Sequence, residues 1–509
     1  MEKLRMTNEI TAENKKTEKG KLFLFLHIAL LCVGAAIYIP SAFFDALWFD
    51  EAYTVGLLSR NLFELVRWSV HDVHPPLYYA LLKIFTLPFG GTVISMRLLS
   101  AACYLLFAAI GLSHIRKDFG EKTGLYFTFF SLFLGAGLFY ALQIRMYSLA
   151  CVFVTLAAVY ARRVYVAPCR KNTALFVLFS VLSAYTHHFA LFTVACVNLA
   201  MLSEEKKRFG NFKNWWGRAW WQIGCYLPGA AIFLYQIVNG GASWITFDSP
   251  DWVFDFCFYP FAGKQLEDVI PHGTVAYYAA GGGLVALWTA AVVFTVNLFQ
   301  KKKIKLPATE YALRTIGYLL AITIFVSFFR PVYYVRYTMT FFGLTCFVFA
   351  SALSAIGSKR VKAAVLCLIA AAFAGNGYFL EKADFSSGYD DMIAYVSEDL
   401  KEGDIFFSDN CVEYVFTVSF PEVTCYFANC SGWHVEKAYR AFGENCYVVP
   451  DVDCEELTSL GGRVWVVSGE RTEAFLSGRE EWSLVKSETF HTEYQDKTYR
   501  VALYEKQTD

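Results

Sequence analysis

Acidic side chains and a histidine gather in one polar stretch of an otherwise apolar chain. Asp50 and Glu51 follow an aromatic pair just after an apolar run, and Asp72 and His74 stand immediately before a proline pair. A carboxylate held among aromatic rings at a membrane surface is partly desolvated, which raises its basicity. Such a group suits general-base removal of a proton from a hydroxyl. The alternative for residues 50–51 is an acidic first turn of a helix.

Two arginines elsewhere lie at boundaries of apolar runs. Arg145 and Arg336 each lie in a short polar interruption between such runs, and Tyr147 and Tyr337 follow them closely. A guanidinium group at such a boundary can bind an anion through charge-assisted hydrogen bonds. Snorkelling of each arginine to lipid headgroups is the alternative. We expect the two tyrosines to orient or pack, not to react.

A histidine pair raises the question of a metal ion. His187 and His188 lie in a turn between two short apolar runs. Together with Glu51, Asp72 and His74 they could bind a divalent metal ion, the one cofactor that the sequence suggests. The alternative is a pair of interfacial histidines that bond to backbone or water.

The composition shows what must position these residues. Of 509 residues, 56% are hydrophobic and 18% aromatic, the mean hydropathy is +0.38, and the apolar residues form long blocks. This composition is typical of a membrane protein. The formal net charge is zero, so no basic field favours nucleic acid as a partner.

Apolar runs of membrane-spanning length predict an all-α polytopic membrane domain. We expect spans near 22–40, 96–115, 123–141, 146–161, 172–186, 189–203, 219–238, 275–299, 309–329, 337–356 and 361–380. Residues 76–93 are also apolar, but two prolines, two glycines and Lys83 interrupt them, so they fit a helix lying on the membrane equally well.

The distribution of basic residues decides between these alternatives. Cytoplasmic loops carry an excess of Lys and Arg. If the basic segment 1–21 is cytoplasmic and residues 76–93 do not cross, all the strongly basic loops face the same side: 116–122, 162–171, 203–218, 300–305 and 357–362. This predicts eleven spans in a multi-pass plasma-membrane protein.

The same topology divides the chain into three parts. A cytoplasmic segment, 1–21, precedes a transmembrane domain, 22–380, whose long first outer loop covers 41–95. Residues 381–509 form a polar extracytosolic tail with short β-type runs and one helical run, which predicts a small α/β domain. Five of the 14 cysteines fall in this tail, where one or two disulfides could form.

Four strings in the first 200 residues resemble the GT-C glycosyltransferases. They are FDEAYT, DVHPPLYYALLK, SMRLLSAACYLL and LQIRMYSLA, and RPVYYVRYT at 330–338 is similar to a late arginine–tyrosine motif of the same family. The family includes the protein O-mannosyltransferases and the aminoarabinose transferases that act on lipid A. No WWDYG-like string is present, which argues against an oligosaccharyltransferase. The tail lacks the lumenal insertions of eukaryotic mannosyltransferases, which points to a bacterial enzyme.

The resemblance implies a chemistry and assigns roles. The donor would be a polyprenyl-phosphate-linked sugar, the acceptor a hydroxyl of a lipid, glycan or protein, and the displacement inverting. Asp50 would be the base, Glu51 would orient it or bind substrate or metal, and Arg145 and Arg336 would neutralise the leaving phosphate. Arg97 could belong to the same pocket.

The sequence departs from these relatives at the proline pair. The mannosyltransferases have a glycine and lysine after it and the aminoarabinose transferases a lysine before it, whereas here His74 precedes it and Leu77 and Tyr78 follow. The resemblance therefore supplies no lysine for the donor phosphate at this point. A lipid-linked sugar transporter or flippase is the main alternative function, but it would show charged residues within spans and internal repeats.

Overall fold

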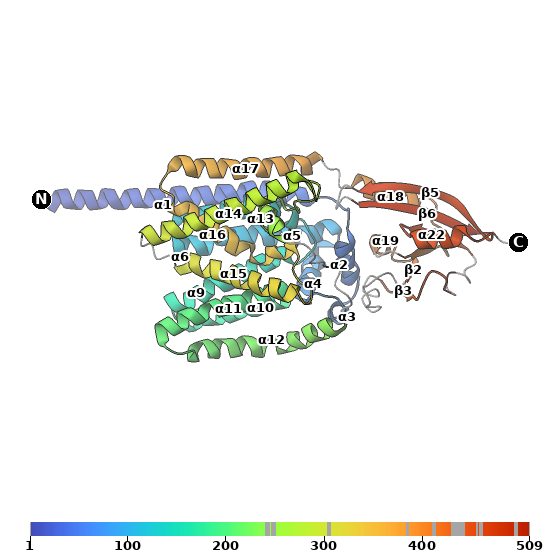
Figure 1. Ribbon diagram of the computed structural model, residues 1–509, viewed down its shortest axis with the longest axis horizontal. Coiled ribbons are helices and arrows are strands. Elements are labelled where there is room, and N and C mark those ends of the chain that lie inside the picture. Colours follow the sequence, from blue (N-terminus) through green and yellow to red (C-terminus); the bar gives the residue numbers. More distant parts are fainter. Residues whose placement is uncertain are drawn as a thin grey trace.

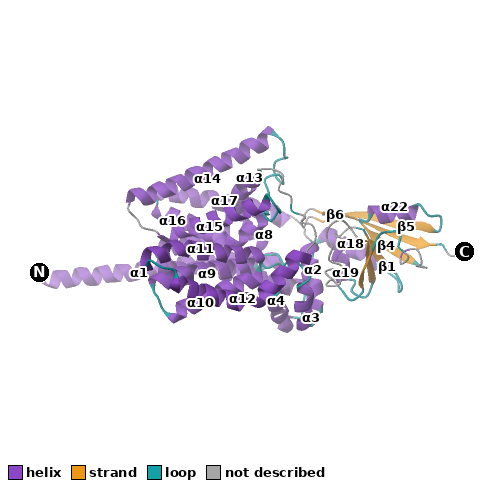
Figure 2. Cartoon of the chain, turned by 60° about the horizontal axis from the view of Figure 1, so that its bottom comes forward, coloured by secondary structure: helices purple, strands orange, loops and turns teal. Residues whose placement is uncertain are grey.

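The computed structural model consists of a helical body followed by a smaller domain built on one sheet (Figure 1). The structure describes residues 2–239, 245, 251–302, 307–382, 386–409, 414–428, 443–454, 457, 462–492 and 497–507. Both figures place the amino-terminal end of α1 (Glu2–Tyr38) and the sheet domain at opposite ends of the helical body (Figure 2).

Within the described ranges, seven helical stretches are long and apolar enough to cross a membrane by length and composition. They are Glu18–Ala42, Val93–Phe119, Tyr147–Val166, Val275–Phe294, Ala308–Ser327, Val335–Ala355 and Lys359–Gly377. The elements that contain them are α1, α5 (Val93–Ile110) with η3 (Gly111–Ile115) and α6 (Arg116–Phe119), α9 (Tyr147–Val166), α14 (Val275–Lys302), α15 (Pro307–Ser327), η4 (Val335–Phe341) with α16 (Phe342–Ala355), and α17 (Lys359–Lys382). The chain is a multi-pass membrane protein.

Helices also occupy the other four predicted spans. They are α7 (Glu121–Phe133) with α8 (Gly135–Tyr140), α10 (Arg170–Thr186), α11 (His188–Phe209) and α12 (Lys213–Asn239). These helices do not meet the same length and hydropathy criteria, so the total of eleven spans stays a prediction.

A break between α7 and α8 interrupts one expected span. Leu134 has an extended backbone there, and a Cβ on Gly135 would lie 2.0 Å from the carbonyl oxygen of Phe261. Phe261 belongs to α13 (Trp252–Ala262). The glycine therefore lets the backbone of α13 approach the break closely.

The long first loop folds into short helices. After η1 (Pro40–Ala42) come α2 (Phe49–Ser59), α3 (Leu62–Ser69), α4 (Leu77–Thr86) and η2 (Leu87–Phe89). The 10 residues of α4 rise about 15 Å, half of a bilayer's hydrocarbon core. This length agrees with a helix that does not cross. We call the end of the body formed by residues 41–92 the loop end, and the opposite end the basic end.

The tail confirms the predicted small α/β domain. Its six-stranded sheet has the order β3-β2-β1-β4-β6-β5, with β1 to β4 parallel and β6 antiparallel to both neighbours. The elements are α18 (Ser387–Ser397), β1 (Ile405–Ser408), α19 (Tyr414–Ser419), β2 (Thr424–Ala428), β3 (Cys446–Val449), β4 (Arg463–Val467), α22 (Glu470–Ser477), β5 (Trp482–Thr492) and β6 (Lys497–Lys506). Sequence patterns missed β3 and β5.

The tail cysteines form no disulfide among the described residues. Cys425 and Cys446 are free thiols, and Cys411 and Cys430 lie outside the described residues. Disulfide formation in this domain stays a prediction.

The tail shares a hydrophobic core with the first loop. One buried cluster joins Leu57 and Leu65 of the loop to Phe406 and Phe416 of the tail. Helix α19 packs against α2 and lies between α2 and the sheet in both views (Figures 1 and 2). Since α2 carries Asp50 and Glu51, the tail supports the element that presents them.

Candidate active site

Three segments bring the predicted residues together at the loop end. Asp50 and Glu51 occupy the first turn of α2, Arg145 lies in the turn between α8 and α9, and Arg336 lies in η4. Tyr147 begins α9 and Tyr337 follows Arg336.

Asp50 lies between the two arginines. Its Oδ2 is 3.3 Å from Nη1 of Arg336 and 4.0 Å from Nε of Arg145. Arg145 also donates from Nη1 to the carbonyl oxygen of Asp50 at 3.0 Å. The Asp50 side chain is 15% exposed and that of Glu51 is 0% exposed, so Asp50 is the accessible carboxylate of the pair.

Glu51 is enclosed and fully engaged. Arg97 donates from Nη1 and Nη2 to its two carboxylate oxygens at 2.7 and 3.0 Å, and the backbone N–H of Ile144 donates to it at 2.8 Å. Both side chains of the Glu51–Arg97 pair are 0% exposed. Arg97 also donates to the carbonyl oxygens of Phe44 and Leu142. This geometry makes Glu51 a residue that fixes the first loop against α5, and it leaves no open face for a substrate or metal.

Asp72 joins the same network through a tyrosine. Tyr79 donates its hydroxyl to Oδ2 of Asp72 at 3.0 Å, and Nη1 of Arg145 donates to the Tyr79 hydroxyl and to Oγ1 of Thr54, both at 3.3 Å. Burial raises the pKa of Asp72 from 3.8 to about 6, although Arg145 opposes the shift. Asp72 therefore positions Arg145 indirectly, through Tyr79.

His74 and His187 lie side by side at the wall of the site. Their ring centroids are 5.1 Å apart, and the His187 ring is 5.3 Å from that of Tyr337. Burial, reinforced for His74 by Arg145, lowers the pKa of both imidazoles well below the ordinary 6.5. Both rings are therefore neutral near pH 7, and a neutral imidazole can both donate and accept a hydrogen bond.

His188 faces another way. Its Nε2 is 2.7 Å from Oε1 of Gln236, and its ring packs on Phe233. His187 instead uses Nδ1 to accept from the N–H of Phe189 at the start of α11. The predicted histidine pair therefore splits, and only His187 borders the site.

The histidines do not provide a metal site. Among the described residues, no group of three or more His, Cys, Asp or Glu side chains is arranged to hold a metal ion. Three ring nitrogens of His74, His187 and His188 have no partner among the described residues: His74 Nδ1, His187 Nε2 and His188 Nδ1. Because His188 faces another way, only two of them border the site, fewer than the three or four protein ligands that zinc takes. These residues do not fit a divalent metal, and no step below uses one.

Several buried polar atoms around Asp50 have no hydrogen-bond partner within the described residues. They are Nε1 of Trp48, Nδ1 of His74, Nε of Arg145, the hydroxyl of Tyr147 and Nε2 of His187. Arg336 lies 5.8 Å over the Trp48 ring and 6.0 Å from that of Tyr337. Buried groups of this kind require an explanation, such as a polar ligand or water. The cluster combines two cations, donors and aromatic faces, the chemistry that sugar phosphates require.

Solved structures show the same arrangement of elements. No protein-family model and no curated protein matches the sequence. The structure of ArnT from Cupriavidus metallidurans in the apo state aligns over 94% of this chain and 97% of its own, with 13% identity and a TM-score of 0.62. The same protein bound to undecaprenyl phosphate aligns over 96% of this chain and 98% of its own, with 14% identity and a TM-score of 0.58.

The chain has the GT-C fold. The GT-C fold extends over nearly the whole chain, including the tail, and not only over the region with matching strings. The predicted fold class is thereby confirmed.

Sequence reasoning missed two residues of the candidate site. Tyr79 links Asp72 to Arg145. Gln236 donates from Nε2 to the carbonyl oxygens of Ser69 and His74 at 3.3 and 3.1 Å, so it ties α12 to the first loop. Burying a side-chain amide costs free energy unless the amide is hydrogen-bonded. Gln236 lies in an apolar run of the sequence, and this was the signal that could have identified it.

Lys83 does not take part in the site. Its Nζ donates to the carbonyl oxygen of Leu58 at 2.6 Å, near the C-terminus of α2. A cation at this position interacts favourably with the helix dipole. The departure from the lysine pattern of related enzymes therefore leaves Arg145 and Arg336 as the cations nearest to Asp50.

Proposed function

We propose that the protein is a membrane glycosyltransferase that moves a sugar from a polyprenyl-phosphate donor to an acceptor hydroxyl on the extracytosolic face. The observation that carries the proposal is the contact of one accessible carboxylate, Asp50, with Arg336 and Arg145 at the loop end. The GT-C fold supports it, because one solved structure of this fold holds undecaprenyl phosphate.

The sidedness rests on charge. The basic segment 1–21 and the Lys- and Arg-rich loops belong to the end opposite the site in our topology, and such residues favour the cytoplasm. The loop end and the tail would then be extracytosolic, in a bacterial plasma membrane.

The proposed reaction is a single displacement. Asp50 takes the proton of the acceptor hydroxyl, the oxygen forms a bond to the anomeric carbon, and the bond from that carbon to the phosphate oxygen breaks. The electron pair stays on the phosphate. A phosphomonoester has a last pKa of about 6, so it leaves without a general acid, provided that cations stabilise its charge.

Arg145 and Arg336 act both before and after the donor binds in this scheme. Without donor they pair with Asp50. A donor phosphate would attract the same guanidinium groups and loosen their contacts with Asp50, which would free that carboxylate to receive the proton of the acceptor hydroxyl. Tyr147, Tyr337, His74 and Asp72 would line or position the sugar-phosphate site.

Labelled donors test the proposal directly. The purified chain in liposomes is supplied with several radiolabelled polyprenyl-phosphate sugars and membrane acceptors, and wild type is compared with Asp50→Asn and with Asp45→Asn, an exposed aspartate of the same loop. We expect one donor to be consumed, with Asp50→Asn slower by about 10²-fold or more and Asp45→Asn unchanged. Full activity of a folded Asp50→Asn would overturn the assigned base. Movement of a labelled lipid across the bilayer without sugar transfer would favour a flippase.

A further inference from the structure

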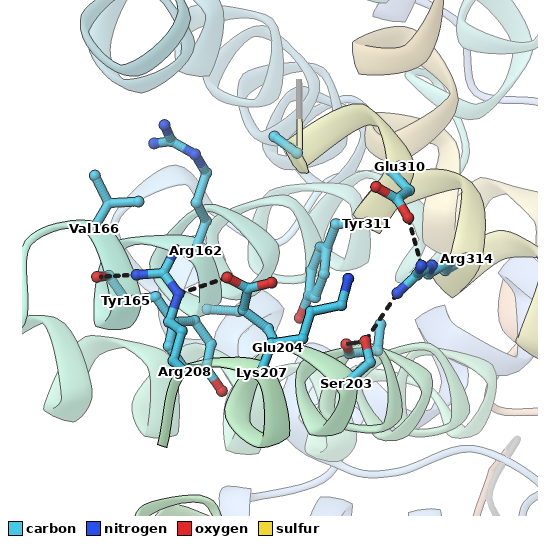
Figure 3. A pocket seen from close by; sticks show the side chains of 13 residues that line it. Arg162, Tyr165, Val166, Ser203, Glu204, Lys207, Arg208, Glu310, Tyr311 and Arg314 are labelled. Carbon is cyan, nitrogen blue, oxygen red and sulfur yellow. Dashed lines mark hydrogen bonds and ion pairs between the residues drawn. The ribbon is translucent and has the colours of Figure 1, made fainter. Parts of the chain in front are cut away.

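A second charged pocket lies at the basic end. Helices α9, α11 and α15 enclose a cavity of about 90 Å³. We call it the basic pocket and define it by its charged lining residues, which are Arg162, Glu204, Lys207, Arg208, Glu310 and Arg314 (Figure 3). The residues of the candidate active site contribute nothing to it.

The charged lining residues of the basic pocket carry two more positive than negative charges, and one of the cations, Arg162, pairs at 3.8 Å with Asp118 outside the lining. Each carboxylate is held by an arginine on its own helix, Glu204 by Arg208 and Glu310 by Arg314. Lys207 lies between these two pairs (Figure 3), and within the described part of the chain its ammonium group shows no acidic partner. The ammonium and the remaining N–H donors can therefore turn to an external anion.

Side chains that bond from one helix to another hold the walls of the basic pocket in place. Tyr165 donates to Oε2 of Glu205 at 2.7 Å, and Arg218 donates to the same oxygen at 2.8 Å. On the facing wall Arg314 donates to Oγ of Ser203 at 2.9 Å. Walls fixed before a ligand arrives reduce the entropy lost on binding.

The depth of the basic pocket matches a lipid headgroup. Val166 ends α9 and is 55% exposed, and α15 begins at Pro307, beside Ala308 of the lining. Lys207 and Arg208 lie in the last turn of α11. Arg162 lies about one turn before the end of α9, and Arg314 lies about two turns after the start of α15. The cations are therefore near helix ends, close to the depth at which a bilayer presents its phosphates, and an apolar wall adjoins them. A free inorganic anion would gain no favourable contact from that apolar wall.

We propose that the basic pocket binds the phosphate group of an anionic glycerophospholipid from the leaflet at the basic end. Basic pockets between membrane helices recognise such headgroups through charge and hydrogen bonds. The bound lipid joins α9 and α11 to α15, so it stabilises the packing of these helices. This inference does not depend on the proposed glycosyl transfer, because the two sites lie at opposite ends of the body.

Native mass spectrometry of the full chain tests lipid retention. The chain is purified in detergent and titrated with phosphatidylglycerol or with zwitterionic phosphatidylcholine. Wild type is compared with Lys207→Gln, with Lys207→Gln/Arg314→Gln and with a matched control, Arg170→Gln/Lys171→Gln. The control residues are exposed at the same end but lie outside the basic pocket. Lys207→Gln removes no ion pair among the described residues. It therefore still tests lipid binding if the double variant fails to fold.

The expected result is one phosphatidylglycerol retained by wild type and by the control. Lys207→Gln should weaken retention several-fold and the double variant about tenfold or more, and phosphatidylcholine should not replace the lipid. Equal retention by all variants, or equal retention of phosphatidylcholine, would overturn the proposal. Binding of inorganic phosphate alone, with no lipid retained, would also overturn it and would identify a site for a free anion.

Discussion

Arg97 donates two parallel hydrogen bonds of 2.7 and 3.0 Å to the carboxylate of Glu51, and neither side chain is exposed to solvent. The two residues come from different elements, α5 and the first turn of α2. The pair holds the turn from which Asp50, the neighbouring residue, faces Arg336. A buried ion pair thus positions the carboxylate to which we assign the chemistry.

Breaking that pair should damage folding more than chemistry. Glu51→Gln or Arg97→Met leaves one buried charge without its partner, which typically costs about 3 to 5 kcal/mol. We expect a marked fall in the unfolding temperature of the detergent-purified chain, measured by scanning fluorimetry. The double variant Glu51→Leu/Arg97→Met should recover part of the loss, because it leaves no lone charge. A stable but inactive Glu51→Gln would contradict this structural role.

Arg336 should contribute to donor binding and to the departure of the phosphate. Arg336→Lys keeps the charge but loses the planar fork of donors, so kcat/KM should fall by about 10- to 100-fold, and Arg336→Met should lose more. The measurement is transfer from the labelled donor at varied concentration. Arg330→Lys, an exposed arginine of the same segment, is the control and should change nothing. Similar losses in both lysine variants would refute the specific role.

Asp72 should make stability depend on pH. Its pKa is about 6 in the folded chain against an ordinary value of 3.8, so the folded state binds this proton more tightly than the unfolded state. The resulting stabilisation is fully present below about pH 4, is lost as pH rises through about 6, and amounts to about 3 kcal/mol at most.

A comparison with Asp72→Asn isolates this effect. The unfolding temperature of wild type should fall relative to that of the variant as pH rises from about 4 to 7. Difference infrared spectroscopy should also detect a protonated carboxyl group below pH 6 that the variant lacks. Parallel pH curves for the two proteins would show that Asp72 titrates normally.

The tail should affect activity through α2. Phe416 is 1% exposed and belongs to the cluster shared with the first loop, so Phe416→Ala should cost about 3 to 5 kcal/mol and should lower transfer. Leu476→Ala is the matched control, because Leu476 is equally buried but belongs to a separate cluster within the tail. Equal effects of both variants on transfer, at equal amounts of folded protein, would indicate that the tail acts only as a separate domain.

The sequence by itself determined the elements and the residues worth testing. Long apolar runs and basic loops are local properties, so they predicted the membrane helices. The side of the basic loops, and not the irregular composition alone, predicted that residues 76–93 do not cross. Short β-type runs in the tail predicted four strands but not β3 and β5. Most residues of β5 are half-buried or exposed and many are polar, so its sequence forms no apolar run.

Only the tertiary structure decided which side chains meet. The sequence did not indicate that Arg97 would enclose Glu51, that His74 would pack on His187 while His188 turned to Gln236, or that Lys83 would bond to a backbone carbonyl. These contacts join residues far apart in the chain, and they depend on how helices pack and where a helix breaks. Hydropathy and charge patterns record which way each residue faces relative to membrane and water, but they do not record its neighbour.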